Sequence, residues 1–268
     1  MGHSAAFFDL DKTLMAGSSG MHFARAAART GMISRRQVAR WGADHVRYRL
    51  RGATDDETDA LLAQIKELLS GTRERDIAWM APEVLAGIIP RIYPRMLDEV
   101  RSHQEAGRPV FIVSAAGNEL VSMLAFVLAM DGGIGTAYAV DEDGMMTGEL
   151  DGPFMYGEGK VTAIERFADE HDIDLSASYA YSDSVSDLPM LRRVGNAVVV
   201  NPDRPLAEIA KAEGWRVMRF EKLGRRLTIA AATAVAASVG WGGSALASRR
   251  RPRGRLPGRR AAPRRRRR

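Results

Sequence analysis

Two aspartates separated by one residue, Asp9 and Asp11, follow an apolar run that begins almost at the N-terminus, in FFDLDKTLM. Residues i and i+2 of a strand point to the same side, so the two carboxylates would share one small volume and repel each other. We therefore expect a cation beside them, supplied by a metal ion, by a lysine from elsewhere in the chain, or by both.

Four further groups that could do chemistry lie near the ends of other apolar runs. Ser114 follows VFIV, Asp183 follows YAYS, and Asp187 lies on the loop that leads into the next short helix. Lys160 heads the predicted helix GKVTAIERFADE. Open α/β sheets bind ligands outside the carboxyl ends of their strands, so we expect these side chains to converge with the aspartate pair.

The carboxylates predict a magnesium site. Two of them at one strand end and a third at another make an oxygen-rich cluster of the kind that Mg²⁺ prefers. The chain has no cysteine, which excludes thiolate metal sites and a disulfide framework, and its five histidines show no ligand spacing. Mg²⁺ and Lys160 are therefore the cations that we expect beside Asp9 and Asp11.

The elements that must position these groups alternate along the second half of the chain. Strands separated by helices of about ten to fifteen residues indicate βαβ units and a parallel sheet. GGIGTA follows a helix rather than a strand, which argues against a dinucleotide-binding fingerprint. We expect strands at 108–115, 178–183, 196–201 and 215–220, a hairpin at 137–150 that turns at Asp143 and Gly144, and helices at 118–130, 159–171, 187–194 and 203–213.

A long stretch with helical signals separates the first strand from the others. Its segments open on Ser or Thr and mostly close near Gly or Pro, the usual signals of helix ends. They cover 18–30, 34–50, 54–70 and 72–88, and another helix within 90–107 leads into the second strand. We expect three or four packed helices inserted after the first strand.

In this order, the motifs resemble those of the haloacid dehalogenase superfamily of phosphotransferases. DLDKT is similar to its first motif, DxDx[TV]; Ser114, Lys160 and SDSVSD are similar to its second, third and fourth. The resemblance covers roughly residues 5 to 220, and the inserted helices are most similar to those of the phosphoserine-phosphatase-like branch. It implies an α/β fold, a Rossmann-like parallel sheet with a helical-bundle cap inserted after the first strand.

The resemblance also implies a role for each site residue in a Mg²⁺-dependent phosphatase. Asp9 would attack phosphorus and form an aspartyl-phosphate, and Asp11 would protonate the leaving oxygen and then activate water. Thr13 and Ser114 would bind phosphoryl oxygens. Lys160 would neutralise the growing charge and hold Asp9. The metal ligands would be the carboxylates of Asp9 and Asp183 with the backbone carbonyl of Asp11, and Asp187 would support the metal shell or position Lys160.

The expected substrate is a small phosphorylated metabolite, with phosphoserine among the candidates. Phosphoserine phosphatases typically place an acidic residue soon after the first motif, yet no Asp or Glu lies between Asp11 and Asp44. SAAG and Ser186 also depart from the usual second and fourth motifs. Arginines of the cap could favour a second anionic group on the substrate, or could form a solvated helical face. They include Arg25, Arg29, Arg36, Arg40 and Arg47.

We expect the core at 1–14 and 90–222, the cap at 15–89, an apolar Ala/Gly-rich segment at 223–248 and a disordered tail at 249–268. The tail holds 12 arginines, which leaves 27 basic and 33 acidic residues in the rest of a chain whose net charge is +6. The uncharged stretch 227–247 is as long as a membrane span but only marginally hydrophobic. Three alternatives remain for this part of the chain. Residues 227–268 could lie on an anionic membrane surface, the apolar stretch could be a weak membrane span, or the whole segment could be a disordered appendage.

The N-terminus lacks the charged region and cleavage site of a secretory signal, so we expect a cytoplasmic protein, associated with the inner face of the membrane if the C-terminal segment binds it. A rival interpretation is a non-catalytic protein with this fold that uses the arginine-rich tail on nucleic acid or acidic partners. The full set of Asp9, Asp11, Lys160 and Asp183 argues against it, because a binding scaffold gains nothing from keeping that set. Nucleic acid is therefore not the expected partner.

Overall fold

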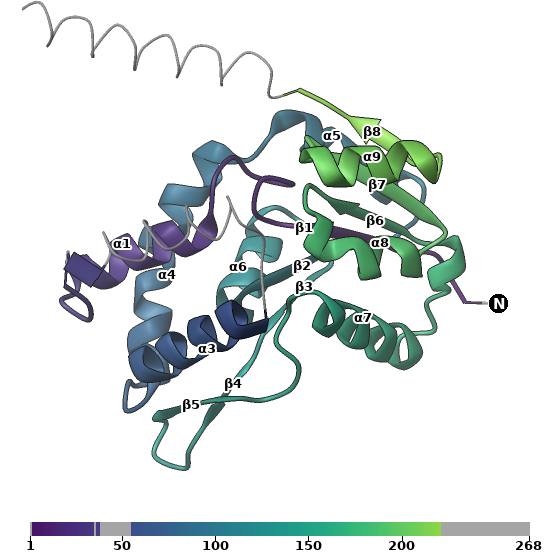
Figure 1. Ribbon diagram of the computed structural model, residues 1–268. Helices are drawn as coiled ribbons and strands as arrows, with labels where there is room; N and C mark the ends of the chain where they lie inside the picture. Colours follow the sequence, from purple (N-terminus) through teal and green to yellow (C-terminus); the bar gives the residue numbers. More distant parts are fainter. Residues whose placement is uncertain (1, 35, 38–54, 221–268) are drawn as a thin grey trace, which may run out of the picture. The chain divides into compact units, whose positions relative to one another are not determined.

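A six-stranded parallel sheet is the centre of the computed structural model, which describes residues 2–34, 36–37 and 55–220 (Figure 1). In the order β3-β2-β1-β6-β7-β8, every neighbouring pair of strands is parallel. β1 therefore lies inside the sheet, with β2 on one side and β6 on the other. The strands are β1 (Ala6–Asp9), β2 (Val110–Gly117), β3 (Gly132–Thr136), β6 (Tyr179–Ser182), β7 (Asn196–Val200) and β8 (Arg216–Met218).

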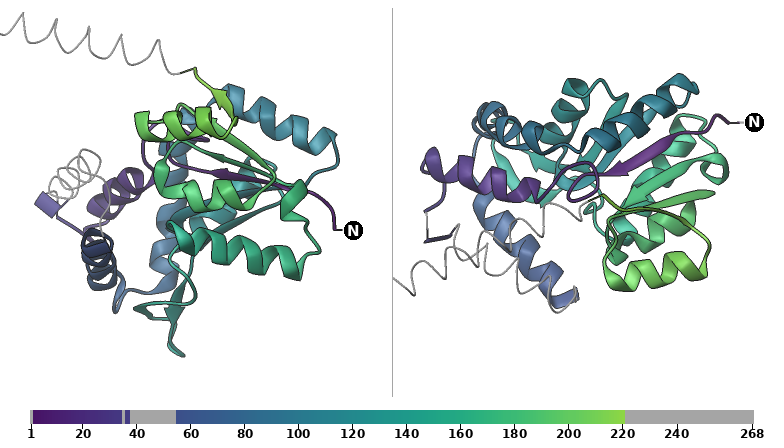
Figure 2. Two further views of the ribbon diagram at one scale, coloured as in Figure 1. Left: turned by 45° about the vertical axis from the view of Figure 1, so that its right-hand side comes forward. Right: turned by 90° about the horizontal axis from the view of Figure 1, so that it is seen from above.

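Helices cover both faces of this sheet (Figure 2). Alternation along β1 sends Phe7 and Phe8 to opposite faces. Phe7 stacks on Phe111 at 5.8 Å between ring centroids, and Phe8 stacks on Tyr181 at 4.2 Å. Burial on both sides explains the unbroken apolar runs of the strands. One face carries α5 (Pro94–Glu105) and α6 (Asn118–Val127), and the other carries α7 (Glu158–Glu170), α8 (Leu188–Arg193) and α9 (Arg204–Ala212).

The strands and helices expected after residue 90 are all present, which confirms the predicted α/β class, and the structure adds β3. Its sequence, GGIGT, has few of the β-branched and aromatic residues that mark a strand. The glycines are there because α6 lies close to β3. A Cβ at Gly133 would be 2.7 Å from the carbonyl carbon of Val121, and one at Gly135 would be 2.6 Å from Cα of Asn118. Close helix packing, and not strand propensity, determines this segment.

Helices lie between β1 and α5, as predicted. They are α1 (Ser19–Arg29), α3 (Asp55–Leu69) and α4 (Glu74–Ile88), followed by the 3-10 turn η1 (Ile89–Arg91). α1 packs against α4. The helix expected at 34–50 lies almost wholly outside the described residues, and the exact division into core and cap stays a prediction.

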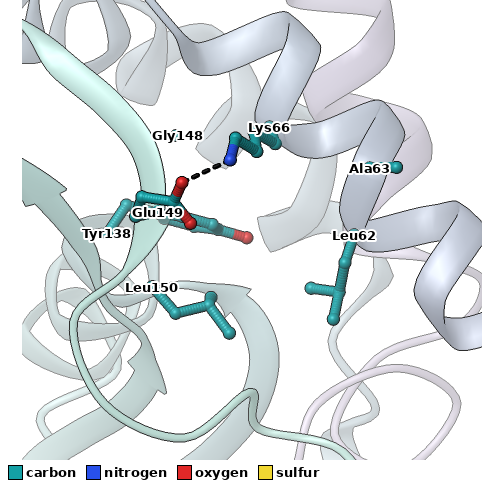
Figure 3. Close-up of a pocket in the computed structure, with 7 residues that line it drawn as sticks. All are labelled: Leu62, Ala63, Lys66, Tyr138, Gly148, Glu149 and Leu150. Carbon is teal, nitrogen blue, oxygen red and sulfur yellow. Dashed lines mark hydrogen bonds and ion pairs between the residues drawn. The ribbon is translucent and has the colours of Figure 1, made fainter.

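The predicted hairpin is present and is bonded to the inserted helices. β4 (Tyr138–Val140) and β5 (Met146–Leu150) are antiparallel. Backbone hydrogen bonds join β5 to the turn after α3: the amide of Gly71 donates to Met146, and the amide of Met146 donates to Thr72. α3 and β5 also enclose a small pocket, crossed by the ion pair of Lys66 and Glu149 (Figure 3). None of the predicted site residues lines this pocket.

The chain divides into two units, Met1–Arg219 and Phe220–Arg268. Of the described residues, all but Phe220 belong to the first unit. The predicted membrane-binding stretch 227–247 and the arginine tail lie outside the described residues. Within 2–34, 36–37 and 55–220, no helix has both the length and the apolar character needed to cross a membrane.

Candidate active site

A buried lysine joins two aspartates at the carboxyl end of β1. Asp9 is the last residue of β1, and Lys160 lies in the first turn of α7. Lys160 Nζ donates hydrogen bonds to Asp9 Oδ1 at 2.6 Å and to Asp187 Oδ2 at 2.8 Å. Ser182, at the end of β6, donates its hydroxyl to the same oxygen of Asp187 at 2.8 Å. The structure thus brings together Asp9, Lys160 and Asp187, as predicted from their positions at strand and helix ends.

The charges in this cluster do not balance. Asp9, Asp183, Asp187 and Lys160 are each at most 8% exposed, so three buried carboxylates lie near one buried cation. Burial, with the charges of Asp187 and Asp183, raises the pKa of Asp9 to about 8, although Lys160 opposes the shift. Burial alone would lower the pKa of Lys160, but Asp187 and Asp9 hold it above its ordinary value. The cluster therefore calls for a further cation.

Asp11 lies in the turn after β1 and not in the strand, because β1 ends at Asp9. The expectation that the two aspartates share one side as residues of a strand therefore does not apply. Instead Asp11 Oδ1 accepts a hydrogen bond from the amide of Ser19, the first residue of α1, at 2.8 Å. The N-terminus of a helix favours a negative charge, so α1 holds this carboxylate beside the end of β1.

Lys12 is a second cation of the site and was not predicted. Its φ of +63° places the backbone in the left-handed region, where the chain turns between Asp11 and Thr13. Lys12 Nζ lies 3.3 Å from Asp183 Oδ2, in an ion pair whose lysine side chain is one-third exposed. The signal was present in the sequence, as a lysine directly after the aspartate pair.

The two predicted phosphate-binding hydroxyls are buried. Thr13 is fully buried, and among the described residues its Oγ1 has no hydrogen-bond partner. Ser114 directly follows Val113, which pairs with Asp9 in the sheet, and its Oγ accepts the amide of Ala116 at 3.2 Å. Ser114 therefore lies beside the end of β1, although β2 itself continues to Gly117.

The donor set fits Mg²⁺. Asp9 and Asp183 supply carboxylates, the Asp11 carbonyl is a further oxygen, and the excess of buried negative charge favours a divalent ion. Over the described part of the chain, no group of three or more Asp, Glu, His or Cys side chains is placed to hold a metal. The predicted set uses two side chains and one carbonyl, a combination that such a group would not include, and it stays a prediction.

Known proteins resemble the chain over most of its length. The profile of the haloacid dehalogenase-like hydrolase family matches residues 6–192. A probable phosphatase of Mycobacterium tuberculosis is 37% identical over 249 residues, 91% of this chain and 86% of that protein. Phosphoserine phosphatase SerB1 of the same organism is 33% identical over 254 residues, 93% and 82% of the two chains. A solved structure from Bordetella pertussis, described as of unknown function, has a TM-score of 0.70 at 29% identity, and the match covers 81% of this chain and 99% of that one.

The family match includes all four motifs, from the aspartate pair at the end of β1, through Ser114 of β2 and Lys160 of α7, to the acidic loop before α8. The resemblance inferred from the motifs is thereby confirmed. The chain belongs to the haloacid dehalogenase-like hydrolase family.

Proposed function

We propose that the protein is a Mg²⁺-dependent phosphomonoesterase that works through an aspartyl-phosphate on Asp9. The observation that carries the proposal is the buried bridge of Lys160 to Asp9 and Asp187, with N–O distances of 2.6 and 2.8 Å. A lysine fixed in this way holds the nucleophile and offsets charge that develops during phosphoryl transfer, where positioning and electrostatics supply most of the catalysis.

In the first step a carboxylate oxygen of Asp9 attacks phosphorus, and the bond from phosphorus to the leaving oxygen breaks. Asp11 gives that oxygen a proton. In the second step Asp11 takes a proton from water, the water oxygen attacks phosphorus, and the bond to Asp9 breaks to release phosphate. The amide of Ser19 fixes Asp11 Oδ1, so Oδ2 is the oxygen that we expect to exchange the proton.

Thr13 and Ser114 would donate their hydroxyls to phosphoryl oxygens. Among the described residues Thr13 Oγ1 has no hydrogen-bond partner, which supports this role, because a buried hydroxyl without a partner is costly unless a ligand satisfies it. Asp9, Asp183 and the Asp11 carbonyl would hold Mg²⁺. When bound, the ion supplies positive charge to the phosphoryl group and to the buried carboxylates.

The substrate that we propose is a small phosphorylated metabolite. The relative named phosphoserine phosphatase makes phosphoserine a candidate. The chain from Lys12 to Ser34 carries no acidic residue that could pair with the ammonium group of phosphoserine. The family resemblance therefore supports the reaction more strongly than it supports this substrate.

The test is hydrolysis of p-nitrophenyl phosphate with and without Mg²⁺. We expect release of phosphate that requires Mg²⁺ and falls by on the order of 10⁴-fold or more in Asp9→Asn. Mass spectrometry of the acid-quenched wild type should find one phosphoryl group on the peptide that contains Asp9. Asp169→Asn, at an exposed position of α7, is the matched control and should keep full activity. A wild type without Mg²⁺-dependent activity, or an active Asp9→Asn, contradicts the proposal.

A further inference from the structure

A histidine and an arginine meet where α1 crosses the end of α4. His22 lies one turn after Ser19, the first residue of α1. Its ring rests on Gly87 of α4, so closely that a Cβ at Gly87 would be 2.2 Å from His22 Nδ1. The carbonyl of Gly87 accepts a hydrogen bond from Arg91 Nη1 at 2.7 Å. Gly87 therefore brings His22 and Arg91 to the same place.

Two backbone connections tie this place to the active site. Ser19, one helical turn before His22, donates its amide to the Asp11 carboxylate. The amide of Ala16 donates to the carbonyl of Arg91 at 2.8 Å, where the loop after the aspartate pair runs beside η1. The charge of Asp11 also acts on His22. Both connections place His22 and Arg91 beside the loop that follows the aspartate pair.

The charge here is positive, and the described residues place no acidic side chain in an ion pair with Arg25 or Arg91. Arg25 lies one turn beyond His22, and burial, Arg91 and Arg25, in that order, lower the pKa of His22. Arg29, one turn further along α1, pairs with Glu83 at 2.6 Å. In contrast, no carboxylate in the described parts of the chain lies within 4 Å of a guanidinium nitrogen of Arg25 or Arg91.

Helix packing accounts for the position of the His22 ring on Gly87, but it does not require two arginines beside the proposed phosphate site that have no carboxylate partner in the described parts of the chain. We propose that His22, Arg25 and Arg91 bind a second anionic group, a carboxylate or a second phosphate, of the phosphomonoester that the active site hydrolyses. This inference rests on the proposed function and narrows it to acidic substrates without an ammonium group.

Three probes of similar size test this preference. 3-Phosphoglycerate carries a carboxylate, glycerol 3-phosphate a neutral hydroxymethyl group, and phosphoserine a carboxylate with an ammonium group. We expect kcat/KM of the wild type to be about tenfold higher for 3-phosphoglycerate than for the other two, the effect of one hydrogen-bonded charge. Fructose 1,6-bisphosphate compared with fructose 6-phosphate tests whether a second phosphate serves as well as a carboxylate.

Charge variants then locate the preference. Arg25→Gln and Arg91→Gln should each reduce the ratio of kcat/KM for 3-phosphoglycerate over glycerol 3-phosphate severalfold, mainly through a higher KM. Arg25→Lys, which keeps the charge, should retain most of the ratio. Arg29→Gln is the matched control, because it lies on the same helix but is paired with Glu83, and it should leave the ratio unchanged.

A wild type that hydrolyses p-nitrophenyl phosphate but shows equal kcat/KM for 3-phosphoglycerate and glycerol 3-phosphate overturns this inference alone. So does a ratio that falls equally in Arg29→Gln and Arg25→Gln. A wild type that hydrolyses none of the phosphate esters, p-nitrophenyl phosphate included, contradicts the proposed function itself.

Discussion

Two buried polar networks lie on opposite faces of the central sheet and differ in how completely they are satisfied. The Lys160 network, made of Asp9, Lys160, Ser182 and Asp187, lies on the face covered by α7 and α8. The α5 network lies on the other face and consists of Glu99, His103, Arg108, Tyr181 and Arg216. Adjacent residues of β6, Tyr181 and Ser182, belong to different networks because alternate side chains of a strand point to opposite faces.

In the α5 network every buried group has a partner. Arg108 Nε donates to His103 Nδ1 at 2.8 Å, so the ring proton lies on Nε2, which bonds to the Tyr181 hydroxyl at 2.7 Å. That hydroxyl donates to Glu99 at 3.1 Å. The guanidinium of Arg216 donates two hydrogen bonds, of 2.7 and 2.8 Å, to the two carboxylate oxygens of Glu99. The buried members are neutral, and the charged members lie nearer the surface.

The Lys160 network reverses this arrangement. Except for Ser182, its buried members are charged, its carboxylates outnumber its cation, and the hydroxyl of nearby Thr13 has no partner within the described chain. A buried, unbalanced charge costs free energy unless something binds there, so the two networks separate a stabilising role from a binding role. The predictions below test this distinction.

The largest effect should follow Lys160→Met, which leaves Asp9 and Asp187 buried without their cation. We expect the free energy of unfolding to fall by about 3–5 kcal/mol, as when one partner of a buried ion pair is removed. Phosphatase activity should fall by on the order of 10³-fold or more, because the nucleophile is no longer held. Chemical denaturation and p-nitrophenyl phosphate hydrolysis measure the two effects.

Lys66→Met is the matched control, since Lys66 is half exposed in its ion pair with Glu149 (Figure 3). Its effect on stability should stay within about 1 kcal/mol, with activity unchanged. Adding Asp187→Asn to Lys160→Met removes one buried charge and should restore part of the stability but not the activity. If the double variant were no more stable than Lys160→Met, the argument from unbalanced charge would be wrong.

For the α5 network, the corresponding test is how the free energy of unfolding depends on pH. Burial, helped by the charge of Arg108, lowers the pKa of His103 to about 4 from an ordinary value of 6.5. Between these two pH values the His103 imidazole is protonated in the unfolded chain but stays neutral in the folded chain. The free energy of unfolding therefore falls as the pH drops from 6.5 to 4. The loss from this residue is at most about 3 kcal/mol. Well above pH 6.5 the imidazole is neutral in both states and contributes nothing to the slope.

Denaturation of wild type and His103→Gln across this range separates His103 from the carboxylates that also titrate there. The difference in unfolding free energy between the two should shrink toward acid pH. Tyr181→Phe keeps the imidazole and should keep the wild-type slope, although it is less stable at every pH. A difference between wild type and His103→Gln that does not change with pH would refute the assignment.

The sequence predicted most of the sheet because strands buried on both faces read as apolar runs. Phe7 and Phe8 are such a pair. It failed at β3, where glycines serve the close approach of α6, and no local pattern reports a contact with another element. The order of the strands in the sheet could not be predicted from the sequence either, because β1 pairs with residues more than a hundred positions away.

For the site, the positions of Asp9, Lys160 and Asp187 could be predicted, since polar residues at strand ends converge on one edge of a parallel sheet. Ser182 and Lys12 were missed. A serine at the end of a strand and a lysine in a turn are usually surface residues, and only the structure places them against Asp187 and Asp183. The α5 network was missed for the same reason, as His103 alone gives no sign of its partners.

The smallest expected change in stability, and the clearest contrast between a binding role and a structural role, comes from replacing two buried threonines. Thr13→Val removes a hydroxyl that has no partner among the described residues, so stability should be unchanged or slightly higher. If that hydroxyl binds a phosphoryl oxygen, kcat/KM should fall roughly thirtyfold, about 2 kcal/mol, the value of a hydrogen bond to a charged group. Thr136 is equally buried, but it donates to the Ala115 carbonyl at 3.0 Å and accepts the Met155 amide at 3.3 Å. Thr136→Val should therefore cost about 1–3 kcal/mol of stability and leave kcat/KM intact. Equal stability losses in both variants would place the Thr13 hydroxyl among the structural hydrogen bonds and remove it from the phosphate site.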